Sequence, residues 1–137
     1  MHALLSSVEL ESDAEAVDAH ALVQSRLLGA SDAEREAAAD AVRAALEHPL
    51  MRRAAVAARE GRCRREAPLV VRLEDGTILE SVVDLAFLEE GVWQVVDFKS
   101  DADLTPLLEG YRRQVALYAL GITDATGLPA RGTLLRI

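Results

Sequence analysis

The chain has little of three things: cysteine, long apolar runs and lysine. Its single cysteine, Cys63, cannot form an internal disulfide, and the N-terminus lacks the basic segment, apolar run and small-residue cleavage site of a secretory signal. No apolar stretch approaches the roughly 20 residues that a membrane-spanning helix requires. These absences predict a soluble cytoplasmic protein with no membrane partner.

Net positive charge is also missing, because 23 acidic residues outnumber 15 basic ones and leave a net charge of −8. Affinity for nucleic acid comes mainly from Lys and Arg that neutralise phosphates, so this chain alone should bind DNA poorly. The basic residues are fourteen arginines and one lysine, Lys99. A compact ammonium differs in shape and donor geometry from a planar guanidinium. Lys99 therefore marks a position where arginine does not serve.

The 137 residues, half of them apolar, suit a single domain with one hydrophobic core. We expect a helical part over 1–61 and a catalytic core over 62–137. Boundary signals predict four helices in the first part: Met1–Leu10, a second from Ser12 or Asp13 to Gly29, a third opened by a Ser31/Glu34 capping box, and a fourth from Pro49 to near Gly61.

The second part changes to β-branched runs separated by glycine turns. Its basic connector, 62–65, is explained equally well as a solvated loop or as a phosphate contact. The whole pattern predicts an α/β (α+β) fold with N-terminal helices, a three-stranded antiparallel meander, a helix and a short last strand. The expected strands are Pro68–Leu73, Thr77–Leu88, Val92–Lys99 and Thr133–Ile137, and the Thr105–Pro106 pair opens a helix to about Ile122.

Asp84 and Asp97 lie on the two strands that a two-residue loop at Glu90–Gly91 would pair. That register sets the aspartates opposite each other, with Cβ atoms about 4.5–5.5 Å apart, where like charges destabilise a sheet. They become near neighbours if Glu89 also belongs to the loop. Lys99 projects from the same face as Asp97, and a divalent cation would remove the repulsion. For this D-x-K tripeptide alone, a salt bridge in which Lys99 neutralises the carboxylates is the better interpretation.

The tripeptide does not stand alone. The motifs in chain order are Glu66-Ala67-Pro68, Ser81-Val82-Val83-Asp84, Val95-Val96-Asp97-Phe98-Lys99-Ser100 and Gln114-Val115-Ala116-Leu117-Tyr118. From Glu66 to the end, the chain resembles the PD-(D/E)XK nuclease domains of RecB-like and AddA-like helicase subunits, which usually have glycine where Ser81 stands. The resemblance implies a restriction-endonuclease-like core and Mg²⁺- or Mn²⁺-dependent hydrolysis of DNA in repair or recombination. A helicase motor or partner subunit would supply single-stranded ends.

The resemblance also implies a role for each matched residue. Asp84 and Asp97 would hold the metal, the carbonyl of Phe98 would complete its shell, and Lys99 would orient or stabilise the reacting groups. Glu66 is a catalytic candidate and a possible ligand of a second metal. Gln114 and Tyr118, four apart on one helix face, match the Q-x-x-x-Y motif and are candidates for DNA contact. Core packing is an equally good explanation of Tyr118.

A histidine on an early helix also ligates the metal in the resembled family. His2, which is followed by a small residue and two leucines, matches it best, and His20 is the second candidate. His48 stands beside a helix-stopping proline and is better explained as a cap.

Two other classes of function stay open. The first is a catalytically silent domain of the same fold that binds DNA or braces a helicase, and Asp84, Asp97 and Lys99 together argue against it. The second is a plain protein-interaction domain, which the acidic composition and the Ala-rich helices would suit. Metal binding would distinguish the nuclease from both.

Overall fold

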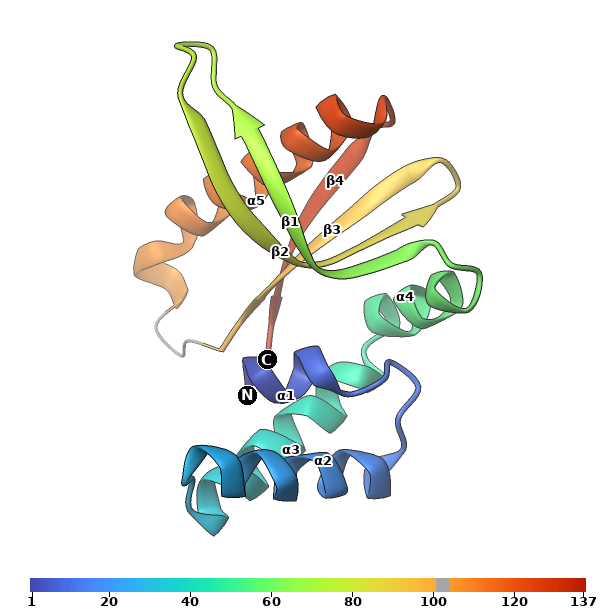
Figure 1. Ribbon diagram of the computed structural model, residues 1–137, viewed down its shortest axis with the longest axis vertical. Helices are drawn as coiled ribbons and strands as arrows, with labels where there is room; N and C mark the ends of the chain where they lie inside the picture. The colour runs from blue at the N-terminus through green and yellow to red at the C-terminus, as the bar shows by residue number, and fades with distance from the viewer. Residues whose placement is uncertain (101–103) are drawn as a thin grey trace. The chain divides into compact units, whose positions relative to one another are not determined.

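The computed structural model describes residues 1–100 and 104–137, the second range with side chains from residue 107 onward. Over these residues the chain has five helices and an open four-stranded mixed sheet (Figure 1). Its contacts divide it into a helical unit, Met1–Val56 with Ile137, and a sheet unit, Ala57–Arg136. The division falls close to the predicted boundary at 61/62. Within the described ranges, no helix has both the length and the apolarity needed to cross a membrane.

The helices before the sheet follow the predicted boundary signals. They are α1 (His2–Ser7), α2 (Ala14–Leu28), α3 (Asp32–Glu47) and α4 (Pro49–Arg59). The Asp13 carboxylate caps α2 by accepting the Ala16 N–H at 2.8 Å, and Gly29, at φ 68°, ends it. Because only glycine adopts such a φ without strain, the residue fixes the end of the helix.

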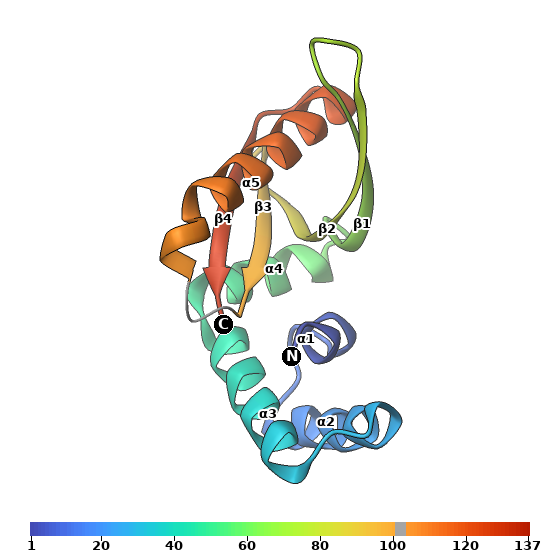
Figure 2. The same cartoon turned by 90° about the vertical axis from the view of Figure 1, so that its left-hand side faces the viewer.

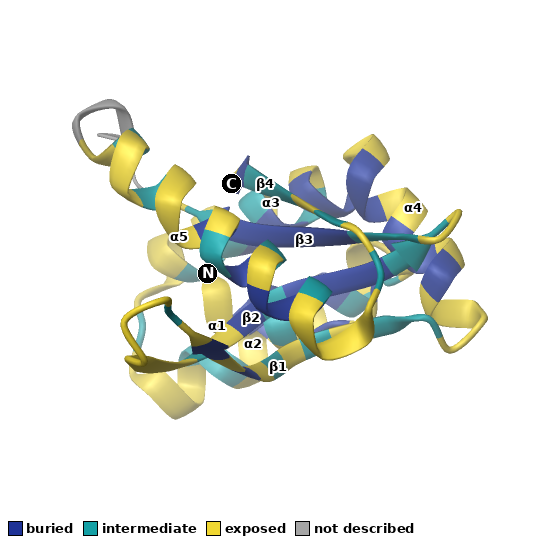
Figure 3. Cartoon of the chain, turned by 90° about the horizontal axis from the view of Figure 1, so that it is seen from above, coloured by how far each residue is buried: buried dark blue, intermediate teal, exposed yellow. Residues whose placement is uncertain are grey.

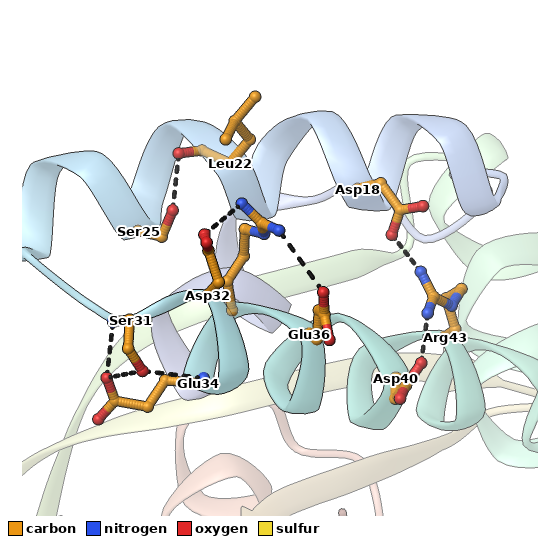
Figure 4. Close-up of polar contacts among 10 residues, drawn as sticks. Asp18, Leu22, Ser25, Ser31, Asp32, Glu34, Glu36, Asp40 and Arg43 are labelled. Atoms are coloured by element: carbon orange, nitrogen blue, oxygen red, sulfur yellow. Dashed lines mark hydrogen bonds and ion pairs between the residues drawn. The ribbon is translucent and has the colours of Figure 1, made fainter.

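Figure 4 shows polar contacts within α3 and between α2 and α3. The predicted capping box is confirmed, because Ser31 Oγ accepts the Glu34 N–H and the Glu34 carboxylate accepts the Ser31 N–H at 2.7 Å. Farther along α3, Arg43 contacts Asp40 on its own helix and Asp18 on α2. These exposed pairs orient the two helices more than they stabilise them.

The sheet order is β1 (Cys63–Arg72), β2 (Ile78–Glu89), β3 (Val92–Lys99) and β4 (Ala130–Arg136). The first three strands form the predicted antiparallel meander, and β4 pairs parallel to β3 after the crossover helix α5 (Leu104–Thr126). The loop interpretation of the basic connector is wrong for Cys63–Arg65, since these residues pair with Leu85–Phe87 at the start of β1. Backbone pairing with an apolar neighbouring strand outweighs their polar composition.

Boundaries elsewhere differ by a few residues. Helix α1 ends at Ser7 instead of Leu10, and α5 continues to Thr126, where Gly127 at φ 74° follows it. The last strand begins at Ala130 because it pairs along β3 from Trp93 onward. The side chains of the predicted cap pair Thr105–Pro106 lie outside the described residues.

Helix α5 packs along one face of the sheet (Figure 2). Two glycines allow the close approach: a Cβ on Gly121 would lie 2.8 Å from Val71 Cγ2, and one on Gly132 would lie 3.0 Å from the Val115 carbonyl oxygen. The buried cluster between helix and sheet consists of Leu69, Val71, Val83, Ala86, Val95, Val115, Tyr118 and Ile122.

One detail of this cluster locates an irregularity in the sheet. Val83 and Ala86 both belong to the cluster, although residues three apart on a regular strand point to opposite faces. The alternation is therefore broken between them, where Asp84 lies. On the neighbouring strand, Glu66 has φ 48°, which is rare for a residue other than glycine. Figure 1 shows that β1 and β2 both bend along their length.

Candidate active site

The predicted register of the β2–β3 hairpin is confirmed. Glu89 pairs with Val92 across a two-residue loop, and the ladder continues to Leu85 and Val96. It stops one step before Asp84 and Asp97 would meet.

Beyond that step the two strands are no longer paired with each other, and each stays paired with the strand on its other side. Strand β2 continues along β1, where Val83 pairs with Ala67, while β3 continues along β4, where Asp97 pairs with Leu134. Figure 1 shows β1 and β2 turning away from β3. The sheet therefore splits where the sequence places its two aspartates.

Asp84 connects the two branches of the split sheet. Its Oδ2 accepts the backbone N–H of Phe98 at 2.8 Å. A side-chain carboxylate thus replaces the backbone acceptor that the interrupted ladder would have supplied. Because Phe98 directly follows Asp97, this bond fixes the Asp84 carboxylate beside the Asp97 position.

Asp97 is one of the few polar residues in the core, with 6% of its surface exposed. It lies in the long buried stretch of β3 (Figure 3). Its Oδ2 is 2.9 Å from the Lys99 Nζ atom, yet among the described atoms this oxygen has no partner with hydrogen-bond geometry. The nearby ammonium compensates the charge of this oxygen, but the hydrogen-bonding capacity of the buried atom is not filled. The oxygen is therefore suited to a cation.

Lys99 lies between the sheet and α5, with 19% of its side chain exposed. Besides Asp97, its Nζ is 3.5 Å from Oε1 of Gln114 and 4.2 Å from the centre of the Tyr111 ring. The structure thus brings together Lys99 and Asp97, as their spacing predicted, and adds Gln114, which the sequence had indicated only as a candidate for DNA contact. Tyr111 was missed as a site residue, because an aromatic residue on a helix that packs against a sheet normally indicates core packing. Its position three residues before Gln114, on the same helix face, could have indicated it.

Glu66 lies on β1 at the step that faces Asp84. It stands between the pairs Arg65–Leu85 and Ala67–Val83 but forms no ladder pair itself, and its side chain is exposed. Glu66 and Asp84 therefore lie at the same step of β1 and β2, whereas Asp97 lies on β3 beyond the end of the β2–β3 ladder. Burial lowers the pKa of the Arg65 guanidinium, and the neighbouring Glu66 carboxylate opposes this effect.

Tyr118 is buried in the core under the sheet. Its hydroxyl accepts a hydrogen bond from Ser81 Oγ at 2.7 Å, so it faces the sheet together with Gln114 on the same helix. Core packing accounts for the placement of Tyr118. Contact of either residue with DNA stays a prediction.

The three histidines belong to the helical unit. His2 is exposed at the first position of α1, and His20 Nδ1 lies 3.1 Å from the Ala16 carbonyl oxygen. His48 Nδ1 accepts the Leu50 N–H at 3.1 Å, which confirms the predicted cap. A metal-ligating role for His2 or His20 stays a prediction.

The donor set of the split sheet fits a hard divalent cation. Mg²⁺ is usually held by one or two protein carboxylates, with water and substrate phosphates as its other ligands. Asp84 and Asp97 supply such a pair. Within the described part of the chain, no three His, Cys, Asp or Glu side chains form a metal-holding group, so neither Glu66 nor a histidine joins Asp84 and Asp97 in one.

Comparison with known proteins gives no relative from which a role could be transferred. No known protein family matches the chain, and a search of curated proteins finds no significant match.

Proposed function

We propose that this chain is a metal-dependent DNA nuclease domain of the PD-(D/E)XK type, with a restriction-endonuclease-like core. One observation carries the proposal. The sheet splits at Asp84 and Asp97, and beside the split a buried carboxylate oxygen of Asp97 forms an ion pair with the only lysine of the chain but no hydrogen bond. A purely structural salt bridge explains the ion pair but not the interruption of the sheet.

In this proposal Asp84 and Asp97 hold Mg²⁺ or Mn²⁺, with the Phe98 carbonyl as a further ligand. When bound, such an ion polarises a phosphate and lowers the pKa of the attacking water. Lys99 places a fixed positive charge beside the two carboxylates, where it stabilises the negative charge that develops on the phosphate. Glu66, at the step of β1 that faces Asp84, is the proposed ligand of a second ion.

The proposed substrate, single-stranded DNA ends, is inferred from the net charge of the chain and from the resemblance. A net charge of −8 disfavours capture of DNA by this chain alone, so we propose that a helicase motor delivers single-stranded ends. Adding or fusing the cognate motor should raise the cleavage rate of the chain. Equal rates with and without the motor would contradict delivery while leaving the nuclease itself in place.

Charge-removing variants test the active site directly. Asp84→Asn keeps an acceptor for the Phe98 N–H, and Asp97→Asn keeps the volume of the buried side chain, so both should fold. We expect each to lose Mn²⁺-dependent cleavage of an end-labelled single strand. Asp124→Asn, an exposed change on α5, is the matched control and should cleave like the parent. Asp97→Asn cleaving at the parent rate would refute the proposed function.

A further inference from the structure

The ammonium of Lys99 lies over the face of an aromatic ring. The distance from Nζ to the centre of the Tyr111 ring is 4.2 Å, within the range of about 6 Å in which a cation is attracted to the negative face of a ring. Lys99 is mostly shielded from solvent and Tyr111 is half-buried. Partial desolvation strengthens this attraction, since less water competes for the ammonium.

The Tyr111 ring is carried by a stiffer side chain than the Lys99 ammonium, since a tyrosine has only two rotatable side-chain bonds. Tyr111 belongs to α5, which is anchored on the sheet one turn later by the buried Val115. Lys99 is the last residue of β3 and carries a flexible four-carbon stem. A ring in a fixed place therefore restricts where the ammonium can lie.

The other contacts of Lys99 restrict the position of its ammonium less than the ring does. The Gln114 Oε1 atom is at 3.5 Å, the outer limit for a hydrogen bond, and the Asp97 contact lacks hydrogen-bond geometry at Oδ2. In the proposed reaction Asp97 would also share its charge with a divalent cation, which weakens its hold on Lys99. The ring is neutral and does not compete for that cation.

We propose that Tyr111 is the positioning residue of Lys99: its ring face holds the ammonium beside Asp97 during the reaction, and its hydroxyl is not required. The catalytic part of this inference rests on the proposed nuclease function. It separates Tyr111 from Tyr118, whose hydroxyl is used in the core.

Two variants distinguish the ring face from mere packing. Tyr111→Phe keeps the ring, whereas Tyr111→Leu keeps an apolar side chain without a π-face. A partly desolvated cation–π contact corresponds to about 5- to 30-fold in an equilibrium or rate. We expect Tyr111→Leu to lower kcat by that factor with KM little changed, and Tyr111→Phe to restore the parent kcat.

The single lysine also allows a measurement that does not depend on cleavage. Isotope labelling of lysine alone gives NMR signals from Lys99 only. The ring current should shift its ε-methylene protons upfield in the parent and in Tyr111→Phe, and the shift should vanish in Tyr111→Leu. Thermal unfolding of the three proteins checks that each is folded.

The outcomes separate this inference from the proposed function. No upfield shift in the parent would overturn the contact, and a shift that Tyr111→Leu loses without any fall in kcat would overturn the positioning role. Equal loss of kcat in the Phe and Leu variants would show that the hydroxyl, not the ring face, matters. A parent that shows the shift but cleaves nothing would refute the nuclease function and, with it, the catalytic part of this inference.

Discussion

Replacing Lys99 by arginine tests why the chain uses lysine at this position and arginine at its other fourteen basic positions. The ammonium lies 2.9 Å from Asp97 Oδ2, 3.5 Å from Gln114 Oε1 and 4.2 Å from the Tyr111 ring centre. A planar guanidinium is larger and directs its donors in a fixed fork. A guanidinium cannot fit between Asp97, Gln114 and the Tyr111 ring without moving the positive charge away from the position of the ammonium. Folding should be nearly intact, because Lys99→Arg keeps a cation beside Asp97.

The loss of one electrostatic contact to a developing charge typically reduces the rate by about 10²–10³, or roughly 3–4 kcal/mol. We expect that loss in single-turnover cleavage of an end-labelled single strand with Mn²⁺. The unfolding midpoint should change little. If Lys99→Arg cuts DNA at close to the parent rate while Asp97→Ala is inactive in the same assay, the lysine is a structural salt-bridge partner and the reasoning is refuted.

Three further predictions concern the metal, the packing of α5 and a helix cap. Calorimetry should show Mn²⁺ binding that Asp97→Ala abolishes, and unchanged affinity would exclude this site. Gly132→Ala should destabilise the fold by about 1–3 kcal/mol, since its Cβ would lie 3.0 Å from the Val115 carbonyl oxygen, whereas Gly110→Ala, with open space around it, should not. The Ser31 backbone N–H lowers the pKa of Glu34, so the ionised cap stabilises the fold above pH 4.5 and this contribution disappears as pH falls through the lowered value. The difference in melting temperature between the parent and Glu34→Gln should therefore shrink in acid, and a constant difference would contradict the assignment.

Sequence reasoning succeeded for elements whose boundaries are set by local chemistry. The capping box at Ser31, the left-handed turn at Gly29 and the two-residue loop of the β2–β3 hairpin each depend on a few adjacent residues. It failed for Cys63–Arg65, because their strand conformation depends on pairing with a distant segment. The parallel pairing of β4 with β3 is likewise a tertiary property that no local pattern states.

The candidate site could be predicted in part for the same reason. The hairpin register is confirmed as far as Leu85 and Val96, but the predicted direct pair of Asp84 and Asp97 does not form, because the ladder ends one step earlier. The spacing of two residues correctly placed Lys99 beside Asp97. The split of the sheet could not be foreseen, since it depends on the Asp84 carboxylate replacing a backbone acceptor for Phe98. The contact of Tyr111 with Lys99 was also hidden, because an aromatic residue in a helical apolar stripe normally indicates core packing.

The contact between Lys99 and Asp97 explains how the fold tolerates the buried Asp97 carboxylate. The Lys99 Nζ and Asp97 Oδ2 atoms are 2.9 Å apart, and the side chains of both residues are largely shielded from solvent. Removing one partner of a buried ion pair costs about 3–5 kcal/mol, and the partial exposure of Lys99 should bring this toward the lower limit. Lys99→Met, which keeps the unbranched stem, should therefore destabilise the metal-free chain.

A divalent cation should reverse that loss, because it would take over compensation of Asp97 and bind only the folded chain. We expect Mg²⁺ to raise the melting temperature of Lys99→Met more than that of the parent. The double variant Lys99→Met/Asp97→Asn removes the uncompensated charge, so it should regain stability without Mg²⁺ and lose the Mg²⁺ effect. If Lys99→Met is as stable as the parent without metal, the ammonium does not compensate the Asp97 carboxylate. If Lys99→Met responds to Mg²⁺ no more strongly than the parent, the divalent cation does not replace the ammonium beside Asp97.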